Sequence, residues 1–219
     1  MRIHTAEQLE EALDSELAWR RKELTDVHSS VHGNVGSTQS MLIRAGVALL
    51  YAHWEGGIKG LCAHYLTFIG TSRPKYNTLA APLLAIALHK DFRKHWEARS
   101  LEYTLEIINR VRDGAGSRAK FVPLPTIDTK SNLTSSVLRE VVISLWLNYA
   151  PFLLREKFID ESLVGQRNAI AHGEYLAVDI SKYDSMHSSV LSLLDDFRTQ
   201  ISNIVAPKKF SVGLQDQSA

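Results

Sequence analysis

The sequence predicts an all-α fold, a single-domain helical bundle of about six or seven helices. Apolar residues recur at helical spacing along most of the 219 residues. No segment shows the alternation of apolar and polar residues that is typical of a strand. The length suffices for one domain with a sizeable core, which we place over residues 1–205. Residues 206–219 are expected to form a flexible tail.

The first helix is expected to begin after Thr5, because Thr5 and Gln8 have the spacing of a capping box. It should end at Gly33. Its apolar residues follow one another at threes, fours or a full heptad: Leu9, Leu13, Leu17, Leu24, Val27 and Val31. Arg21 and His28 on the same helix are interpreted as part of a solvated face.

A second helix is expected over residues 37–70. It is apolar on most faces, so we place it centrally in the bundle. Four glycines interrupt it, and each costs about 1 kcal/mol in helix propensity. They predict the close approach of a neighbouring helix, which the sequence does not identify: Gly46, Gly56, Gly57 and Gly60.

Shorter helices are expected over residues 78–92, 100–111 and 134–147. Residues 113–132 are irregular and long for a connection within a domain, and such loops are usually functional or mobile. Asp160 is positioned to cap the start of the helix that leads to Arg167. The last helix should end at Pro207. It carries one apolar stripe: Tyr183, Met186, Val190, Leu193, Leu194, Phe197, Ile201 and Ile204.

The composition is that of an ordinary soluble protein, with 45% hydrophobic and 22% charged residues. The formal net charge of +1 leaves any anionic partner to a local patch. The single cysteine, Cys62, excludes an internal disulfide, fits a reducing cytosol and is expected in the core. The most apolar run, residues 141–154, is shorter than the ~20 residues of a membrane helix. We therefore expect a cytoplasmic protein without a membrane partner.

The stretch "LVGQRNAIAHGEYL", residues 163–176, combines Arg167, Asn168 and His172. Arginine matches the oxygens of a phosphate, and histidine can accept or donate a proton near neutral pH. On one helix, however, Arg167 and His172 lie about 140° apart. Two copies around a two-fold axis would pool both groups in one cleft. The same spacing also fits a helix end at Gly173 with exposed polar residues, and this alternative stays open.

Such a cleft suits metal-independent RNA cleavage by attack of the 2′-hydroxyl. Fixed arginines stabilise the charge that develops on the phosphorane, and histidines move the protons. Asn168 is a candidate for orienting an imidazole or a phosphate oxygen. The alternative function is a non-catalytic helical module that binds RNA, a nucleotide or a protein partner.

"RNAIAHGE" resembles the Arg-x4–6-His signature of the HEPN (higher eukaryotes and prokaryotes nucleotide-binding) superfamily. Three longer stretches resemble the bacterial MAE-like HEPN proteins, a group regarded as ribonucleases of toxin or phage-defence systems: "LYAHWEGGIKGLCAHYLTFI", "SNLTSSVLREV" and "FIDESLVGQRNAIAHGEY". The resemblance covers roughly residues 10–205. It implies an all-α homodimer that cleaves RNA without a metal or cofactor, with Arg167 and His172 in the catalytic positions and Asn168 in the polar one.

The resemblance also suggests three further residues. Some HEPN ribonucleases carry a Glu-x3-Lys-Arg motif, which Glu55 and Lys59 match in part because Gly60 stands at the second basic position. These two residues are candidates for supporting catalysis or binding RNA, or else form an intrahelical ion pair. Tyr175 matches a tyrosine that an antitoxin modifies in some HEPN toxins, so a cognate antitoxin or defence-system partner is implied. Tyr175 otherwise anchors the chain after the helix.

No metal site is expected from the sequence. His53 and His64 are eleven residues apart, which places them roughly 16 Å apart along a helix. We identify no histidine pair at i, i+4 spacing with a carboxylate nearby. Residues 89–99 mix basic and aromatic side chains that could hold single-stranded RNA, although such a run is more often a solvated helix face.

Overall fold

The computed structural model describes residues 3–98, 100–119, 121, 132–175, 177–207 and 210. Within these ranges the chain is helical, and the expected all-α fold is confirmed. The described part contains no strand, only an isolated β-bridge between Lys75 and Arg118. None of the described helices is both long and apolar enough to span a bilayer.

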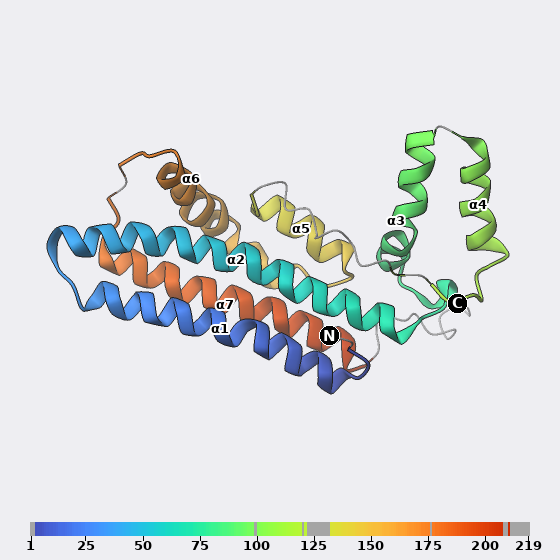
Figure 1. Ribbon diagram of the computed structural model, residues 1–219, viewed down its shortest axis with the longest axis horizontal. Coiled ribbons are helices and arrows are strands. Elements are labelled where there is room, and N and C mark those ends of the chain that lie inside the picture. Colours follow the sequence, from blue (N-terminus) through green and yellow to red (C-terminus); the bar gives the residue numbers. More distant parts are fainter. Residues whose placement is uncertain are drawn as a thin grey trace.

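Three long helices form the body of the molecule: α1 (Ala6–His32), α2 (Gly36–Ser72) and α7 (Ile180–Val205). They lie side by side along its length, as Figure 1 shows. The apolar stripes expected for α1 and α7 face this core, where Leu13, Leu17 and Phe197 are almost completely buried. Each such side chain contributes roughly 1.5–3 kcal/mol through burial. The single cysteine, Cys62, is also buried, as expected.

The helix caps follow the sequence signals. Thr5 Oγ1 accepts a hydrogen bond from the Gln8 amide (3.2 Å), and Gln8 Oε1 accepts one from the His4 amide (2.8 Å). These bonds satisfy amide groups that the first turn of α1 leaves without a partner. At the start of α7, Asp179 Oδ1 accepts from the Lys182 amide (2.8 Å). The first helix ends at Gly33, as expected.

The glycines of α2 identify the neighbours that approach it closely. A Cβ at Gly46 would lie 2.6 Å from Tyr183 Oη of α7. One at Gly56 would lie 2.9 Å from Arg20 Nη1 of α1. A side chain at Gly60 would collide with the Glu16 carboxylate, also of α1. Small residues in α2 therefore let both α1 and α7 pack against it at short range.

The remaining helices lie outside this body (Figure 1). A hairpin of α3 (Ala81–Ala98) and α4 (Leu101–Arg112) projects at one end, and Arg110 of α4 pairs with Asp91 of α3. At its base is the short 3-10 helix η1 (Tyr76–Thr78). The helix α5 (Ser135–Ser144) and the 3-10 helix η2 (Ala150–Arg155) lead back towards the motif.

The motif-bearing segment differs from the expectation at its start. A π-helix, η3 (Phe158–Gly165), continues directly into α6 (Gln166–Ala171), so Asp160 lies inside a helix and does not cap one there. Its carboxylate instead accepts hydrogen bonds from the amide (2.7 Å) and hydroxyl (2.6 Å) of Ser135. Asp160 therefore caps α5 from across the fold, where a negative charge is favoured.

The structure describes residues 206, 207 and 210 of the expected C-terminal tail. After α7 ends at Val205, Phe210 is buried against Phe68, with ring centroids 5.8 Å apart. Its carbonyl accepts a hydrogen bond from the Ala80 amide (3.5 Å). Residues 208, 209 and 211–219 lie outside the described residues, as does most of the irregular stretch between 113 and 132. The boundary between domain and flexible tail stays a prediction.

Candidate functional site

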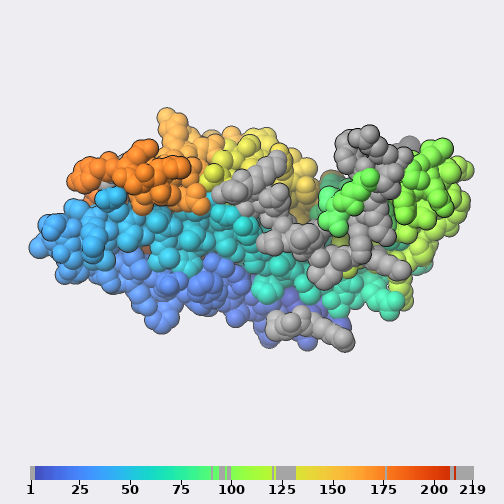
Figure 2. All heavy atoms as spheres, turned by 45° about the horizontal axis from the view of Figure 1, so that its top comes forward, coloured from blue at the N-terminus to red at the C-terminus, as the bar shows by residue number. Residues whose placement is uncertain are grey.

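His172 lies at the end of α6, as expected. The amide of Gly173 donates to the Ile170 carbonyl (3.1 Å), and that of Glu174 donates to the Ala169 carbonyl (2.9 Å). Gly173 has φ +77°, a left-handed conformation that glycine adopts without strain. This termination leaves the His172 side chain exposed to solvent. Figure 2 shows the segment (orange) on the surface, over the N-terminal part of α2 (light blue).

Arg167 is held from three directions at the start of α6. Its Nη1 donates to Asn132 Oδ1 (3.0 Å) and to Asn168 Oδ1 (2.8 Å). The centre of the guanidinium lies 4.4 Å from the centroid of the Tyr51 ring on α2, a cation–π distance. Arg167 is partly buried. Its position therefore depends on side chains from α2, from the segment before α5 and from α6 itself.

The segment that carries Asn132 is itself anchored to α2. The Leu133 amide donates to Tyr51 Oη (2.9 Å), and Trp54 Nε1 donates to the Leu133 carbonyl (3.4 Å). Trp54 is completely buried and Leu133 is as well. Because Tyr51 and the segment that carries Asn132 are fixed by the core, the guanidinium is held in place before any ligand binds.

Tyr51 remains a neutral phenol under physiological conditions. Burial raises its pKa to about 12, and hydrogen bonding to Glu55 acts in the same direction. Arg167 opposes this shift without overcoming it. Tyr51 is therefore suited to hold Arg167 and Leu133 in place, and its deprotonation is too unfavourable for it to serve as a general base.

Glu55 and Lys59 form the intrahelical ion pair that the spacing allowed, with Lys59 Nζ 2.6 Å from Glu55 Oε1. Tyr51, Glu55 and Lys59 are successively four residues apart, so they follow one face of α2 towards Arg167. The neighbouring Gly60 packs on the Glu16 side chain of α1. A role of Glu55 and Lys59 in RNA binding stays a prediction.

The chain brings Arg167 and Asn168 together but not Arg167 and His172. Asn168 Oδ1 accepts a hydrogen bond from the Arg167 guanidinium (2.8 Å), a contact that the sequence did not predict. Its expected role in orienting an imidazole or a phosphate oxygen stays a prediction. Among the described residues, the His172 amide donates to the Asn168 carbonyl (2.9 Å), but no hydrogen bond joins the His172 ring to the side chain of Arg167 or Asn168. At five residues' separation the two catalytic candidates are about 7.5 Å apart along the helix axis and about 140° apart around it.

Tyr175 follows the helix end and has an exposed fraction of 84%. The Arg44 guanidinium of α2 lies 5.7 Å from its ring centroid, and Arg44 Nη2 donates to the Glu174 carbonyl (3.3 Å). These contacts tie the chain loosely to α2 and leave the phenol accessible.

Two other sequence features remain apart from this site. In the basic run of α3, the described Arg93 lies 3.7 Å from Glu97, and both side chains are solvated. The side chains of residues 90, 94–96 and 99 lie outside the description. Arg21, taken as part of a solvated face, is exposed and pairs there with Asp195 of α7.

Tyr51 and Asn132 are site residues that the motif alone does not identify. Each had a weak signal: Tyr51 precedes Glu55 by one helical turn, and Asn132 stands in a stretch with HEPN resemblance. Neither can be assigned to Arg167 from sequence, because the contacts join segments 35 and 116 residues away from it along the chain.

An all-helical bundle with Arg167 at the start of one short helix and His172 at its end is the arrangement that the HEPN resemblance implies. The model of the RiboL-PSP-HEPN family matches residues 15–203, and the chain belongs to this family. The match includes every residue of the candidate site. No curated protein and no solved structure matches the chain.

Proposed function

We propose that this protein is a metal-independent endoribonuclease, related to the MAE-like HEPN proteins, that acts in a toxin or phage-defence system. It cleaves RNA by attack of a 2′-hydroxyl at a site composed from two subunits. The observation that carries the proposal is the preorganised Arg167, held by Asn132, Asn168 and Tyr51 beside an HEPN motif.

Arg167 is suited to bind the scissile phosphate. Its Nη1 donates hydrogen bonds to the side-chain oxygens of Asn132 and Asn168, whereas Nη2 and Nε have no hydrogen bond to any described residue. These free donors are available to phosphate oxygens, and their fixed orientation favours the charge that builds up in the transition state.

His172 is suited to move protons because its ring is exposed and unbonded within the described chain. Within one subunit, His172 points about 140° away from Arg167 around the helix, so its ring does not face a phosphate held by that Arg167. A two-fold axis near α6 supplies a ring that does, because the partner subunit then contributes its own His172 beside Arg167. Exposed apolar side chains near this surface, Met41 and Tyr175, support such an interface.

RNA cleavage in EDTA tests the proposal. The purified protein should leave 2′,3′-cyclic phosphate ends, and His172→Ala should abolish cleavage while the dimer persists. His4→Ala, which replaces an exposed histidine ahead of α1, serves as the matched control and should cleave normally. A requirement for a divalent metal, or full activity of His172→Ala, would reject the assignment.

A second candidate is a non-catalytic module that binds RNA, a nucleotide or a protein partner. The separation of His172 from Arg167 within one chain favours it. In this case Arg167→Ala weakens binding and no cleavage is lost. Expression in bacteria separates the two functions: growth arrest that His172→Ala relieves supports the ribonuclease, and harmless expression at high level supports the binding module.

The exposed Tyr175 fits regulation by a cognate antitoxin that modifies its hydroxyl. A nucleotidyltransferase partner in the cytoplasm would add a nucleotide three residues after His172, where its bulk and charge would block RNA. Intact-mass analysis after co-expression with such a partner should show the adduct on the wild type and not on Tyr175→Phe.

A further inference from the structure

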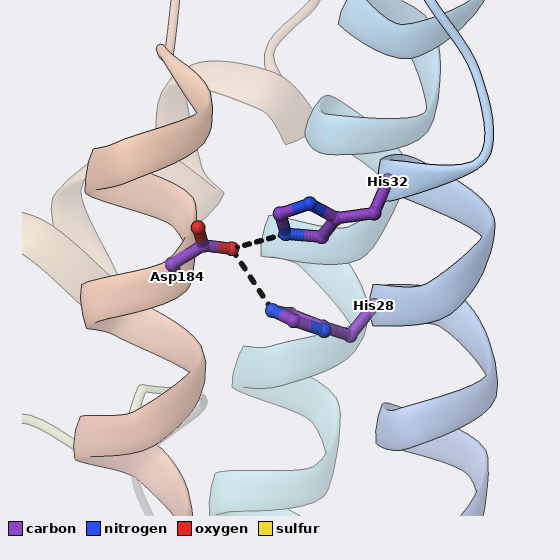
Figure 3. Close-up of side chains that lie close together, drawn as sticks. All are labelled: His28, His32 and Asp184. Carbon is purple, nitrogen blue, oxygen red and sulfur yellow. Dashed lines mark hydrogen bonds and ion pairs between the residues drawn. The ribbon is translucent and has the colours of Figure 1, made fainter.

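Two histidines and an aspartate converge at the end of the bundle where α1 meets α7. His28 and His32 occupy one face of α1, and Asp184 faces them from the beginning of α7 (Figure 3). Both Nε2 atoms approach the same oxygen, Asp184 Oδ1, at 2.9 and 2.8 Å. The three ligand atoms lie within 4.8 Å of one another.

We propose that His28, His32 and Asp184 bind a divalent transition-metal ion, with zinc as the best match. Because its ligands come from both helices, the ion links α1 to α7. This site is separate from the proposed ribonuclease centre and takes no part in its chemistry.

The ligand set matches the preferences of zinc. Histidines four residues apart on a helix present both ring nitrogens to one point, and two imidazoles with one carboxylate form a known type of three-ligand zinc site. Tetrahedral geometry with bonds of about 2.0–2.2 Å requires ligand atoms roughly 3.3–3.5 Å apart. The nitrogen–oxygen distances of 2.8 and 2.9 Å must therefore lengthen by about half an ångström, which small side-chain rotations provide.

The side chains are neither sealed in the core nor freely solvated. Their exposed fractions are 30% for His28, 44% for His32 and 39% for Asp184, so an ion can enter and a water molecule can take the fourth position. This partial exposure also means that no rearrangement of the fold is needed for binding.

A third imidazole lies beside the cluster. The rings of His187 and His28 have centroids 4.4 Å apart. His187 is fixed by a hydrogen bond to the Leu24 backbone, while its Nε2 is buried without a partner in the described chain. A buried, unsatisfied nitrogen costs about 1–3 kcal/mol. Its presence next to His28 is what a site built for an additional ligand would show.

The location gives the ion a structural consequence. His32 is the last residue of α1, and Asp184 is in the second turn of α7, which follows directly after the motif segment. A bound ion would thus fix the start of α7 and, through it, the chain between His172 and Asp179.

Metal titration of the full-length chain, without an affinity tag and after treatment with EDTA, tests the site. Calorimetry with Zn²⁺ should show one ion per chain, and Co²⁺ should give the intense visible absorption of a tetrahedral complex. His32→Ala and Asp184→Asn should each weaken Zn²⁺ binding by at least about tenfold, consistent with the loss of one of three ligands.

The matched control is His64→Ala. His64 lies 3.7 Å from the Glu16 carboxylate, but this is a pair of one histidine and one carboxylate and is not part of the proposed metal site. This variant should bind Zn²⁺ like the wild type. Since His32 is exposed, His32→Ala should retain its helical circular dichroism, and His32→Gln provides a second, polar variant.

Three results would overturn the metal site: no Zn²⁺ binding below about 100 μM, binding by both His32→Ala and His32→Gln that is as tight as binding by the wild type, or Co²⁺ spectra of octahedral type only. These readouts do not depend on RNA cleavage. Cleavage by the EDTA-treated protein tests the ribonuclease proposal alone, so failure of one proposal is distinguishable from failure of the other.

Discussion

At the scale of single residues, the proposed function depends on how firmly Arg167 is oriented. The guanidinium is long and flexible by itself, and fixing it costs conformational entropy. Contacts with Asn132, Asn168 and Tyr51 fix the guanidinium when the protein folds. In the proposed function, RNA binding therefore does not lose this conformational entropy again.

Asn132→Ala tests this orientation. The substitution removes one acceptor for Arg167 Nη1, and hydrogen bonds to charged groups contribute about 1.5–3 kcal/mol. We expect RNA cleavage to fall roughly 10-fold or more while thermal stability changes little. Asn77→Ala, on an exposed surface, is the control and should cleave normally. Unchanged cleavage by Asn132→Ala would show that Arg167 needs no support from this side.

The sequence predicts single residues unevenly. Thr5, Gln8 and Gly173 act within a few residues of their partners, so spacing alone predicts their roles. Asp160 also has a capping side chain, but it caps α5, 25 residues earlier in the chain. His28 and His32 stand at i, i+4, but the carboxylate beside them is Asp184 of α7, so spacing along the chain does not reveal the cluster. Local interactions are readable from sequence, and tertiary ones are not.

At the scale of helices, close packing of α2 depends on its glycines. Gly46→Ala should destabilise the protein by about 1–3 kcal/mol, because the added methyl group would lie 2.6 Å from Tyr183 Oη. This loss should exceed the gain of about 1 kcal/mol in helix propensity. Urea unfolding measures the difference.

Gly116→Ala is the matched control, since no atom lies within 4 Å of the added Cβ. It should leave the free energy of unfolding nearly unchanged. A Gly46→Ala variant as stable as the wild type would mean that α2 and α7 shift apart easily.

A second prediction at this scale concerns pH. Glu156 bonds to Arg139 (2.6 Å) of α5 and to the Tyr149 hydroxyl (3.0 Å), and both lower its pKa, Arg139 the more strongly. A lowered carboxyl pKa contributes stability above the unfolded value, about 4.3, and loses it as pH falls through the folded value. The melting temperature of the wild type should therefore approach that of Glu156→Gln in acid and exceed it near neutrality.

Thermal melts of both proteins between about pH 3 and pH 7 provide the comparison. A constant difference over this range would contradict the role given to Arg139. Because the Arg139 and Glu156 side chains are partly exposed, high salt should reduce the difference.

At the scale of the whole molecule, the composite site predicts complementation between inactive variants. Arg167→Ala and His172→Ala should each be inactive as homodimers. In a mixed dimer the composite site would still combine the intact Arg167 of one subunit with the intact His172 of the other. Mixing the two variants after mild denaturation and refolding should therefore restore measurable cleavage.

Complementation separates a shared site from a self-contained one. If Arg167 and His172 of the same chain acted together, every mixture would stay inactive. A matched mixture of His172→Ala with wild type, which retains active dimers, calibrates the efficiency of subunit exchange.

The overall fold was predictable because helical periodicity is strong in α1, α2 and α7. The site was predictable only as far as the motif. Apolar patterns specify which face of a helix is buried, but they do not specify the rotation of one helix against another. The contact of Arg167 with Tyr51 depends on that rotation.

The π-helix ahead of Arg167 limits how this segment can vary in length. Asp160 accepts a hydrogen bond from Ser135, and Arg167 contacts the Tyr51 ring. The helical turns between Asp160 and Arg167 are therefore held in position at both ends. Deleting one residue there would rotate the guanidinium by about 100° relative to its aromatic partner. The proposed catalysis would then be lost, which makes residue count in this short span as important as residue identity.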